Sequence, residues 1–102
     1  MPRPGLFYKI ESAITFAEEI AGGAEDRWVA RRISGELVPA LLEARTFVKV
    51  GQVSAREVAD ALAKASLIAG EMSDADPRYA RLTSVMRVLR EDAFAAGRAR
   101  RK

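Results

Sequence analysis

Apolar residues recur at every third or fourth position along most of this sequence, and no stretch alternates apolar and polar residues as a half-buried strand does. Such spacing places apolar side chains on one face of an α-helix. Four segments of this kind, divided by glycines, prolines or short polar stretches, account for nearly all of the 102 residues. A chain of this length forms one domain. We therefore predict an all-α fold, a compact bundle of about four amphipathic helices.

The first two predicted helices are separated by a pair of glycines. The first covers about Leu6–Ala21, and Gly22-Gly23 is expected to end it because glycine tolerates a positive φ. The second is long, covers about Glu25–Val50, and is expected to be kinked near Gly35–Pro39, because proline lacks a backbone N–H and clashes with the carbonyl four residues earlier. Its apolar stripe keeps one phase across the proline, which favours one kinked helix over two separate helices. This stripe comprises Val29, Ile33, Leu37, Ala40, Leu41, Ala44 and Val48.

The last two predicted helices begin at capping sequences. Ser54 with Glu57 matches a capping box, and the helix that follows is expected to end at or near Gly70. Asp76-Pro77 places an N-cap residue before a proline at the first helical position, so the fourth helix begins there. We expect that helix to fade near Gly97. Residues 1–97 then form the single helical domain, and residues 98–102 form a basic C-terminal tail.

The sequence contains no cysteine and no histidine, which excludes several kinds of site at once. Disulfides, thiolate nucleophiles, Cys/His zinc sites and Ser-His-Asp triads all need these residues. Asp74-Ala75-Asp76 lacks the further oxygen ligands of a calcium loop, and Gly22-Gly23 lacks the following Lys-Ser/Thr of a phosphate-binding loop. We therefore predict a protein that is not an enzyme and that has neither a cofactor nor a metal site.

Positive charge is concentrated at one end of the chain. Residues 1–76 hold nine Lys or Arg against twelve Asp or Glu, a net charge of −3, whereas residues 77–102 hold eight against two, a net charge of +6. Such asymmetry predicts a polyanionic partner, such as nucleic acid, an acidic protein surface or an anionic membrane. The alternative is a frayed tail that serves only solubility. The basic residues beyond Gly97 are Arg98, Arg100, Arg101 and Lys102.

Two clusters combine an aromatic residue with arginines. Phe94 lies away from the apolar stripe of the fourth helix, beside Arg87 and Arg90. An aromatic ring between arginines can stack on a base while the guanidinium groups meet phosphates, can anchor a protein interface, or can pack against another helix. Trp28 has Arg31 beside it, together with Arg27 and Arg32. An intramolecular cation–π contact and an interface anchor are both open for this tryptophan.

Several aliphatic residues also lie off the predicted stripes. Leu67 in the third helix, and Leu42 and Val38 in the second, project away from the stripes of their helices. Together with the exposed aromatics they predict self-association of the chain. An oligomer would multiply the basic helices and raise the avidity for a polyanion.

Residues 54–62, Ser54-Ala-Arg-Glu-Val-Ala-Asp-Ala-Leu62, resemble the first helix of helix-turn-helix motifs in bacterial regulators. The resemblance implies that the next helix enters the DNA groove, with Arg78, Arg81, Ser84 and Arg87 as candidate readers. The motif needs a tight turn after its first helix, whereas this helix continues through residues 63–69 and a longer connection follows. We therefore favour contacts to the phosphate backbone over sequence-specific reading.

These observations predict a non-enzymatic, oligomeric helical module that associates with nucleic acid through its fourth helix and tail. Phage-type small terminase subunits, which act in DNA packaging, and small nucleoid or plasmid proteins are similar in size, helicity and charge. The alternative is a protein–protein adaptor or regulator that uses the Trp28 and Phe94 clusters. The absence of a secretory pattern and of a membrane-spanning segment makes the cytoplasm the expected location. The predicted nucleic-acid-binding residues are Arg87, Arg90, Phe94, Arg98, Arg100, Arg101 and Lys102, and the predicted interface residues are Trp28, Arg31, Leu42 and Leu67.

Overall fold

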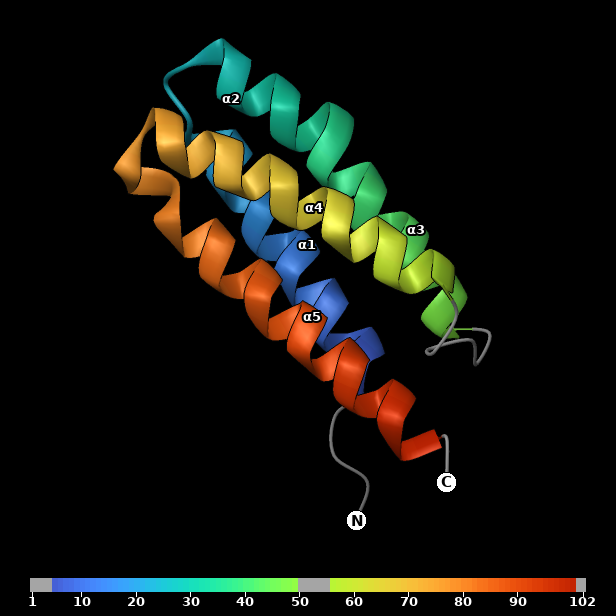
Figure 1. The fold of residues 1–102 in the computed structure, drawn as a ribbon. Helices are drawn as coiled ribbons and strands as arrows, with labels where there is room; N and C mark the ends of the chain where they lie inside the picture. Colours follow the sequence, from blue (N-terminus) through green and yellow to red (C-terminus); the bar gives the residue numbers. More distant parts are fainter. Residues whose placement is uncertain (1–4, 50–55, 101–102) are drawn as a thin grey trace.

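The described part of the chain folds into four helical rods, as predicted (Figure 1). The computed structural model describes residues 5–49 and 56–100, with side chains for 5–49 and 56–94. A π-helical turn, η1, joins α2 to α3, so that these three elements form the second rod. A 3₁₀ turn, η2, precedes α5. The bounds are α1 Leu6–Gly23, α2 Arg27–Arg32, η1 Ile33–Leu37, α3 Val38–Lys49, α4 Arg56–Ala75, η2 Pro77–Tyr79 and α5 Ala80–Arg100.

Consecutive rods run in opposite directions and enclose one core (Figure 1). Helix α1 packs against α3 and α5, and α4 packs against the same two helices from the opposite side of the bundle. Each rod contributes fully buried aliphatic side chains to the core, among them Ile10, Leu41, Leu62 and Leu82. The predicted stripes therefore face the interior, because only that arrangement removes the apolar face of every helix from water.

The distortion predicted near Gly35–Pro39 takes the form of the π turn η1. The backbone N–H of Val38 donates to the carbonyl oxygen of Ile33, five residues earlier, and the chain stays helical on both sides. Proline cannot donate to the carbonyl four residues before it and would clash with that carbonyl, so a wider turn before Pro39 lets the helix continue. The prediction of one continuous helix is confirmed. Val38, predicted off the stripe, is buried at 8% exposure.

Two predicted helix ends are wrong, and a third lies at the predicted glycines without the backbone conformation expected of them. Helix α1 includes Gly22 and Gly23, neither of which adopts a positive φ, and the chain leaves the helix at Ala24 in an extended conformation. Helix α4 continues through Gly70 to Ala75, because Met72 is fully buried and extends the apolar stripe past the glycine. Helix α5 continues past Gly97 to Arg100. Gly70 and Gly97 lie inside their helices, where a glycine weakens the helix without ending it.

The cap predicted at Asp76 is confirmed. Its carboxylate accepts a hydrogen bond from the backbone N–H of Arg78 at 3.0 Å, and Pro77 occupies the first helical position. Asp76 alone separates α4 from η2, so α4 and α5 form a tight antiparallel hairpin (Figure 1). A helix-turn-helix motif crosses its helices at a steep angle instead, so the implied groove-reading geometry is not formed. Ser54 of the predicted capping box lies outside the described residues.

No helix in residues 5–49 or 56–100 has the length and the hydropathy needed to cross a membrane.

Candidate functional site

A groove between α4 and α5 brings together three of the predicted nucleic-acid-binding residues. Arg87, Arg90 and Phe94 line this groove, which has a volume of about 500 Å³. The Phe94 side chain is 68% exposed. The remaining lining residues are Ser66 of α4 and Thr83 and Glu91 of α5.

The floor of this groove is fixed by contact between the two helices. The Thr83 hydroxyl donates to the backbone carbonyl of Ala69 in α4 at 3.3 Å. Leu82, Met86 and Leu89 anchor the inner face of α5 in the core. The outer residues of α5 therefore project from a helix whose rotation about its own axis is set by packing.

The described arginine side chains of η2 and α5 fall into two groups. The Arg78 guanidinium donates to the Asp76 carboxylate at 2.7 Å, and Arg81 lies over the Phe16 ring at 5.6 Å from its centroid. Both side chains are thereby engaged with the rest of the fold. In the described part of the chain no carboxylate lies within ion-pairing distance of Arg87 or Arg90. Among the arginines whose side chains the structure describes on α5, Arg87 and Arg90 are therefore the ones that can neutralise the charge of a ligand.

The turn between α4 and α5 also perturbs two titrations. Hydrogen bonds from the Arg78 side chain and backbone N–H hold the pKa of the Asp76 carboxyl below its usual value. The hydrogen bond to the Asp76 carboxylate likewise raises the pKa of Arg78. Asp26, at the start of α2, lies 3.9 Å from the same guanidinium. The Arg78 guanidinium therefore has its positive charge balanced within the fold.

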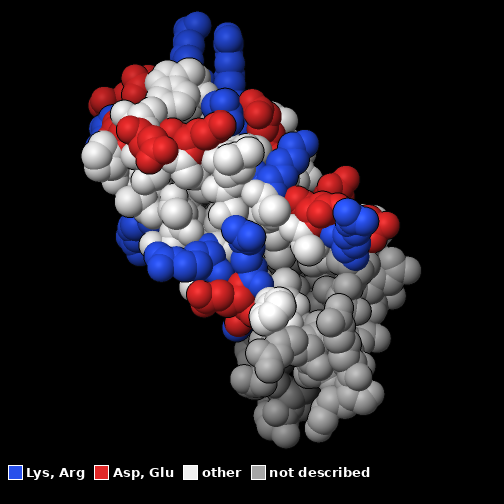
Figure 2. Space-filling model, in the orientation of Figure 1, with Lys and Arg blue, Asp and Glu red and all other residues white. Residues whose placement is uncertain are grey.

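Basic and acidic groups interleave over the described surface on the face seen in Figure 2. No continuous basic stripe crosses the described residues on that face. The structure places the backbone of Arg98 and Arg100 in α5. Arg101 and Lys102, also predicted to bind nucleic acid, lie outside the described residues.

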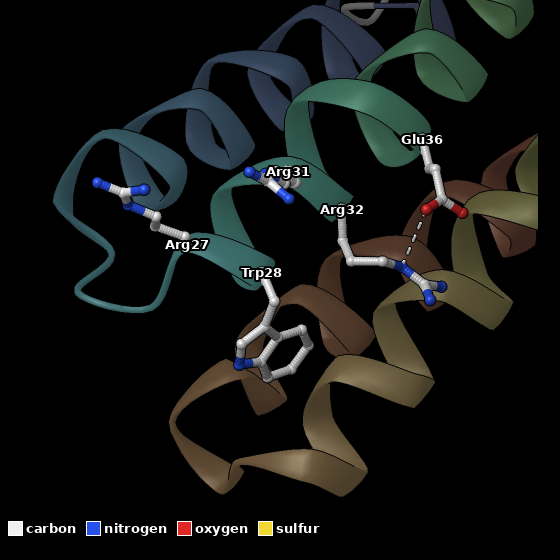
Figure 3. Close-up of a pocket in the computed structure, with 5 residues that line it drawn as sticks. All are labelled: Arg27, Trp28, Arg31, Arg32 and Glu36. Atoms are coloured by element: carbon white, nitrogen blue, oxygen red, sulfur yellow. Dashed lines mark ion pairs between the residues drawn. The ribbon is translucent and has the colours of Figure 1, made fainter.

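The second predicted cluster surrounds Trp28 on α2 (Figure 3). Trp28, Arg27 and Arg31 line a surface pocket of about 470 Å³, with Arg32 and Glu36 at its other side. The indole is 43% exposed. Among the described residues the cation–π contacts are those of Arg78 with Tyr79 and of Arg81 with Phe16. The intramolecular cation–π contact considered for Trp28 is therefore not formed.

Carboxylates neutralise part of the Trp28 cluster. Arg32 Nε lies 3.3 Å from Glu36 Oε2, the contact dashed in Figure 3. The same guanidinium contacts Glu71 of α4 through its Nη2 and so ties α2 to α4. The positive potential beside Trp28 is lower than its three neighbouring arginines alone suggest, because two carboxylates share that surface.

The structure separates the remaining predicted interface residues. Leu67 is 65% exposed on the outside of α4, where it lines a hollow that also includes Arg90. Leu42 is half-buried and packs against the core, so it does not form an exposed interface with Leu67. The reason is that α3 lies between α1 and α4 and buries two sides of its surface.

Sequence reasoning missed Ser66 as part of the groove. Ser66 reaches the groove because α4 is the neighbour of α5 on that side, and the order of helices around the bundle has no signature in the sequence.

Within residues 5–49 and 56–100, no group of three or more carboxylates is placed to hold a metal ion.

A scan against protein-family models finds no match, and searches of curated proteins and of solved structures find no match either.

Proposed function

We propose that this protein is a non-enzymatic helical module that binds nucleic acid, mainly at its phosphates, through the outer side of α5 and the basic residues at the C-terminus. The observation that carries the proposal is the difference among the arginines of η2 and α5. Arg78 and Arg81 are engaged within the fold, whereas Arg87 and Arg90 have no carboxylate partner in the described part of the chain. They lie in the part of the chain whose net charge is +6.

Binding of this kind is driven by the release of counterions from the phosphates. The logarithm of the affinity then falls linearly with the logarithm of the salt concentration, by about 0.9 for each phosphate contacted on duplex DNA. Phosphate contacts carry no sequence information, so affinity should depend little on DNA sequence. A DNA-handling role like that of small terminase subunits is compatible with this mode, on grounds of size, helicity and charge alone.

The test is binding of the full chain to fluorescent duplex DNA of arbitrary sequence across a salt series. Replacement of the four C-terminal basic residues by glutamine should lower the slope by about 3.6 if each contacts one phosphate. A matched control replaces four exposed cations elsewhere and should leave the slope unchanged. Absence of binding at low salt, or an equal effect of the two variants, would contradict the proposal. The test residues are Arg98, Arg100, Arg101 and Lys102, and the control residues are Arg27, Arg31, Lys49 and Lys64.

Self-association and a cytoplasmic location belong to the same proposal. Leu67, at 65% exposure, is the aliphatic residue of the predicted interface that is placed for contact with a second copy. Sedimentation velocity over a range of concentrations tests this, with Leu67→Ser expected to shift the equilibrium toward monomer. A chain that stays monomeric at high concentration would contradict self-association.

A second candidate function, contact with a protein partner, is favoured by the Trp28 pocket. Tryptophan and arginine are the residues that most often dominate protein interfaces, and the nearby Glu36 and Glu71 disfavour phosphate. Trp28 is the single tryptophan of the chain, so its emission reports on this surface. We expect saturation with duplex DNA to leave that emission unchanged. A large change on DNA binding would move the nucleic-acid site to α2.

A further inference from the structure

We propose that the groove between α4 and α5 takes one unstacked nucleobase, so that the protein prefers single-stranded over double-stranded nucleic acid. This inference rests on the proposed function and specifies its substrate class. The groove measures about 500 Å³ and is open to the surface beside Phe94. Space of this size accommodates a flat ring together with its sugar.

Phe94 supplies the surface on which a base stacks. Its side chain is 68% exposed, although it belongs to a residue type that proteins bury when they can. Bases in a duplex already stack on their neighbours, whereas an unpaired base offers its face to an aromatic side chain. Every base has such a face, so the contact tolerates all sequences.

The charged residues of the groove suit a base flanked by phosphates. Arg90 and Arg87 precede Phe94 by one and two helical turns, and all three residues line the groove. Their guanidinium groups can meet the phosphates before and after a base that stacks on Phe94. Glu91 also lines the groove, and its carboxylate repels a phosphate while it accepts hydrogen bonds from the N–H groups of a base edge. The base and not the phosphate therefore belongs inside.

Of the other exposed aromatic side chains, Trp28 also lies beside arginines and a glutamate in a surface pocket. Tyr8, at 63% exposure, lies on α1 and does not line the groove. Trp28 shares its surface with Glu36 and with the Glu71 carboxylate bound to Arg32. Tyr8 therefore serves as a matched exposed aromatic outside the groove.

The first experiment measures fluorescence anisotropy of the full chain with labelled oligothymidylate of about 15 nucleotides and with a duplex of equal length, at one salt concentration. We expect the single strand to bind more tightly. Phe94→Ala should weaken single-strand binding by about 5- to 150-fold and leave duplex binding nearly unchanged. Phe94→Trp should retain binding. Tyr8→Ala is the control and should have no effect on either ligand.

The second experiment fills the groove without altering any charge. Ser66→Leu places an aliphatic side chain where the base would lie and should remove the preference for the single strand. Ala59→Leu adds the same side chain at an exposed position of α4 that does not line the groove, and it should change nothing. Thermal denaturation followed by circular dichroism verifies that each variant is folded.

The outcomes separate this inference from the proposed function. Absence of binding to either ligand overturns both. Salt-dependent binding that is equal for the two ligands, with Phe94→Ala and Ser66→Leu neutral, overturns the inference and retains the proposed function. A Phe94→Ala variant that loses self-association in sedimentation but keeps its single-strand affinity assigns Phe94 to contact between copies and overturns the inference as well.

Discussion

Trp28 on α2 and Phe94 on α5 are both exposed aromatic residues beside a pair of arginines that have no carboxylate partner in the described part of the chain. Their surroundings differ. The Trp28 cluster lies in the part of the chain with a net charge of −3, and Glu36 and Glu71 hold its third arginine. The Phe94 cluster lies in the part with a net charge of +6. The comparison teaches that similar local composition can stand in different charge environments, and on the proposed function this difference decides which ligand each cluster attracts.

The largest effect, on the free energy of unfolding, is expected when a core residue is truncated in the helical segment that carries each cluster. Ile33, next to the Trp28 cluster, and Leu82, on the helix of Phe94, are both fully buried. Ile33→Ala and Leu82→Ala should each lower the free energy of unfolding by about 2–5 kcal/mol, since each leaves a cavity in one shared core. Urea denaturation with an unchanged m-value measures this. A much smaller cost for Ile33→Ala would mean that the α2 segment unfolds separately from the bundle.

Removal of the carboxylates beside Trp28 should reduce the difference in DNA binding that we propose between the two clusters. Glu36→Gln with Glu71→Gln frees Arg32 and adds two units of positive charge to that surface. Duplex DNA should then bind several-fold more tightly, with a salt slope steeper by about 1 for each new phosphate contact. The measurement is the same salt series used for the unmodified chain. If affinity and slope stay unchanged, the surrounding carboxylates are not what keeps DNA from the Trp28 cluster.

A smaller effect is expected at Gly70, in the helix that forms one wall of the Phe94 groove. A Cβ at this position meets no atom within 4 Å, and Gly70 lies inside α4. Gly70→Ala should raise the free energy of unfolding by roughly 0.5–1 kcal/mol through its higher helix propensity. Calorimetry measures the gain, and single-strand affinity should not change. A loss of stability would show that α4 needs the glycine at this point.

The smallest effect, on the melting temperature, concerns Asp76, whose carboxylate holds the Arg78 guanidinium within the α4–α5 turn. Because the folded pKa of Asp76 is lowered, its charge stabilises the fold above the unfolded pKa, and this contribution disappears as the pH falls through the folded pKa. Asp76→Asn retains a capping side chain and removes the charge. The melting temperature of the variant should be lower than that of the unmodified chain at neutral pH and should converge with it on acidification. A difference that persists in acid would assign the effect to the cap and not to the charge.

Helix faces could be predicted from the sequence because burial follows the periodicity of apolar residues. Ile33, Leu37 and Leu41 were assigned to one stripe and all are fully buried. Helix ends at glycines could not be predicted in the same way. Gly70 costs α4 about 1 kcal/mol, but burial of Met72 beyond it returns more than that, so tertiary packing overrides the local signal.

The candidate site could be predicted only along one helix. The grouping of Arg87 and Arg90 with Phe94 followed from helical spacing and is confirmed. The contribution of Ser66 could not be predicted, since it depends on which helix packs beside α5. Leu42 lies off the stripe of its helix, a position that fits either an interface or a second neighbouring helix, and it packs against the core because α3 contacts both α1 and α4.

The most direct test of the account compares two matched pairs of arginines in one salt series with duplex DNA. Arg87→Gln with Arg90→Gln should lower the slope of log affinity against log salt by about 1.8, at about 0.9 for each phosphate contact. Arg27→Gln with Arg31→Gln removes the same charge beside Trp28 and should leave the slope unchanged. Equal changes in the two variants, or a change confined to the second, would contradict the assignment of nucleic-acid binding to α5.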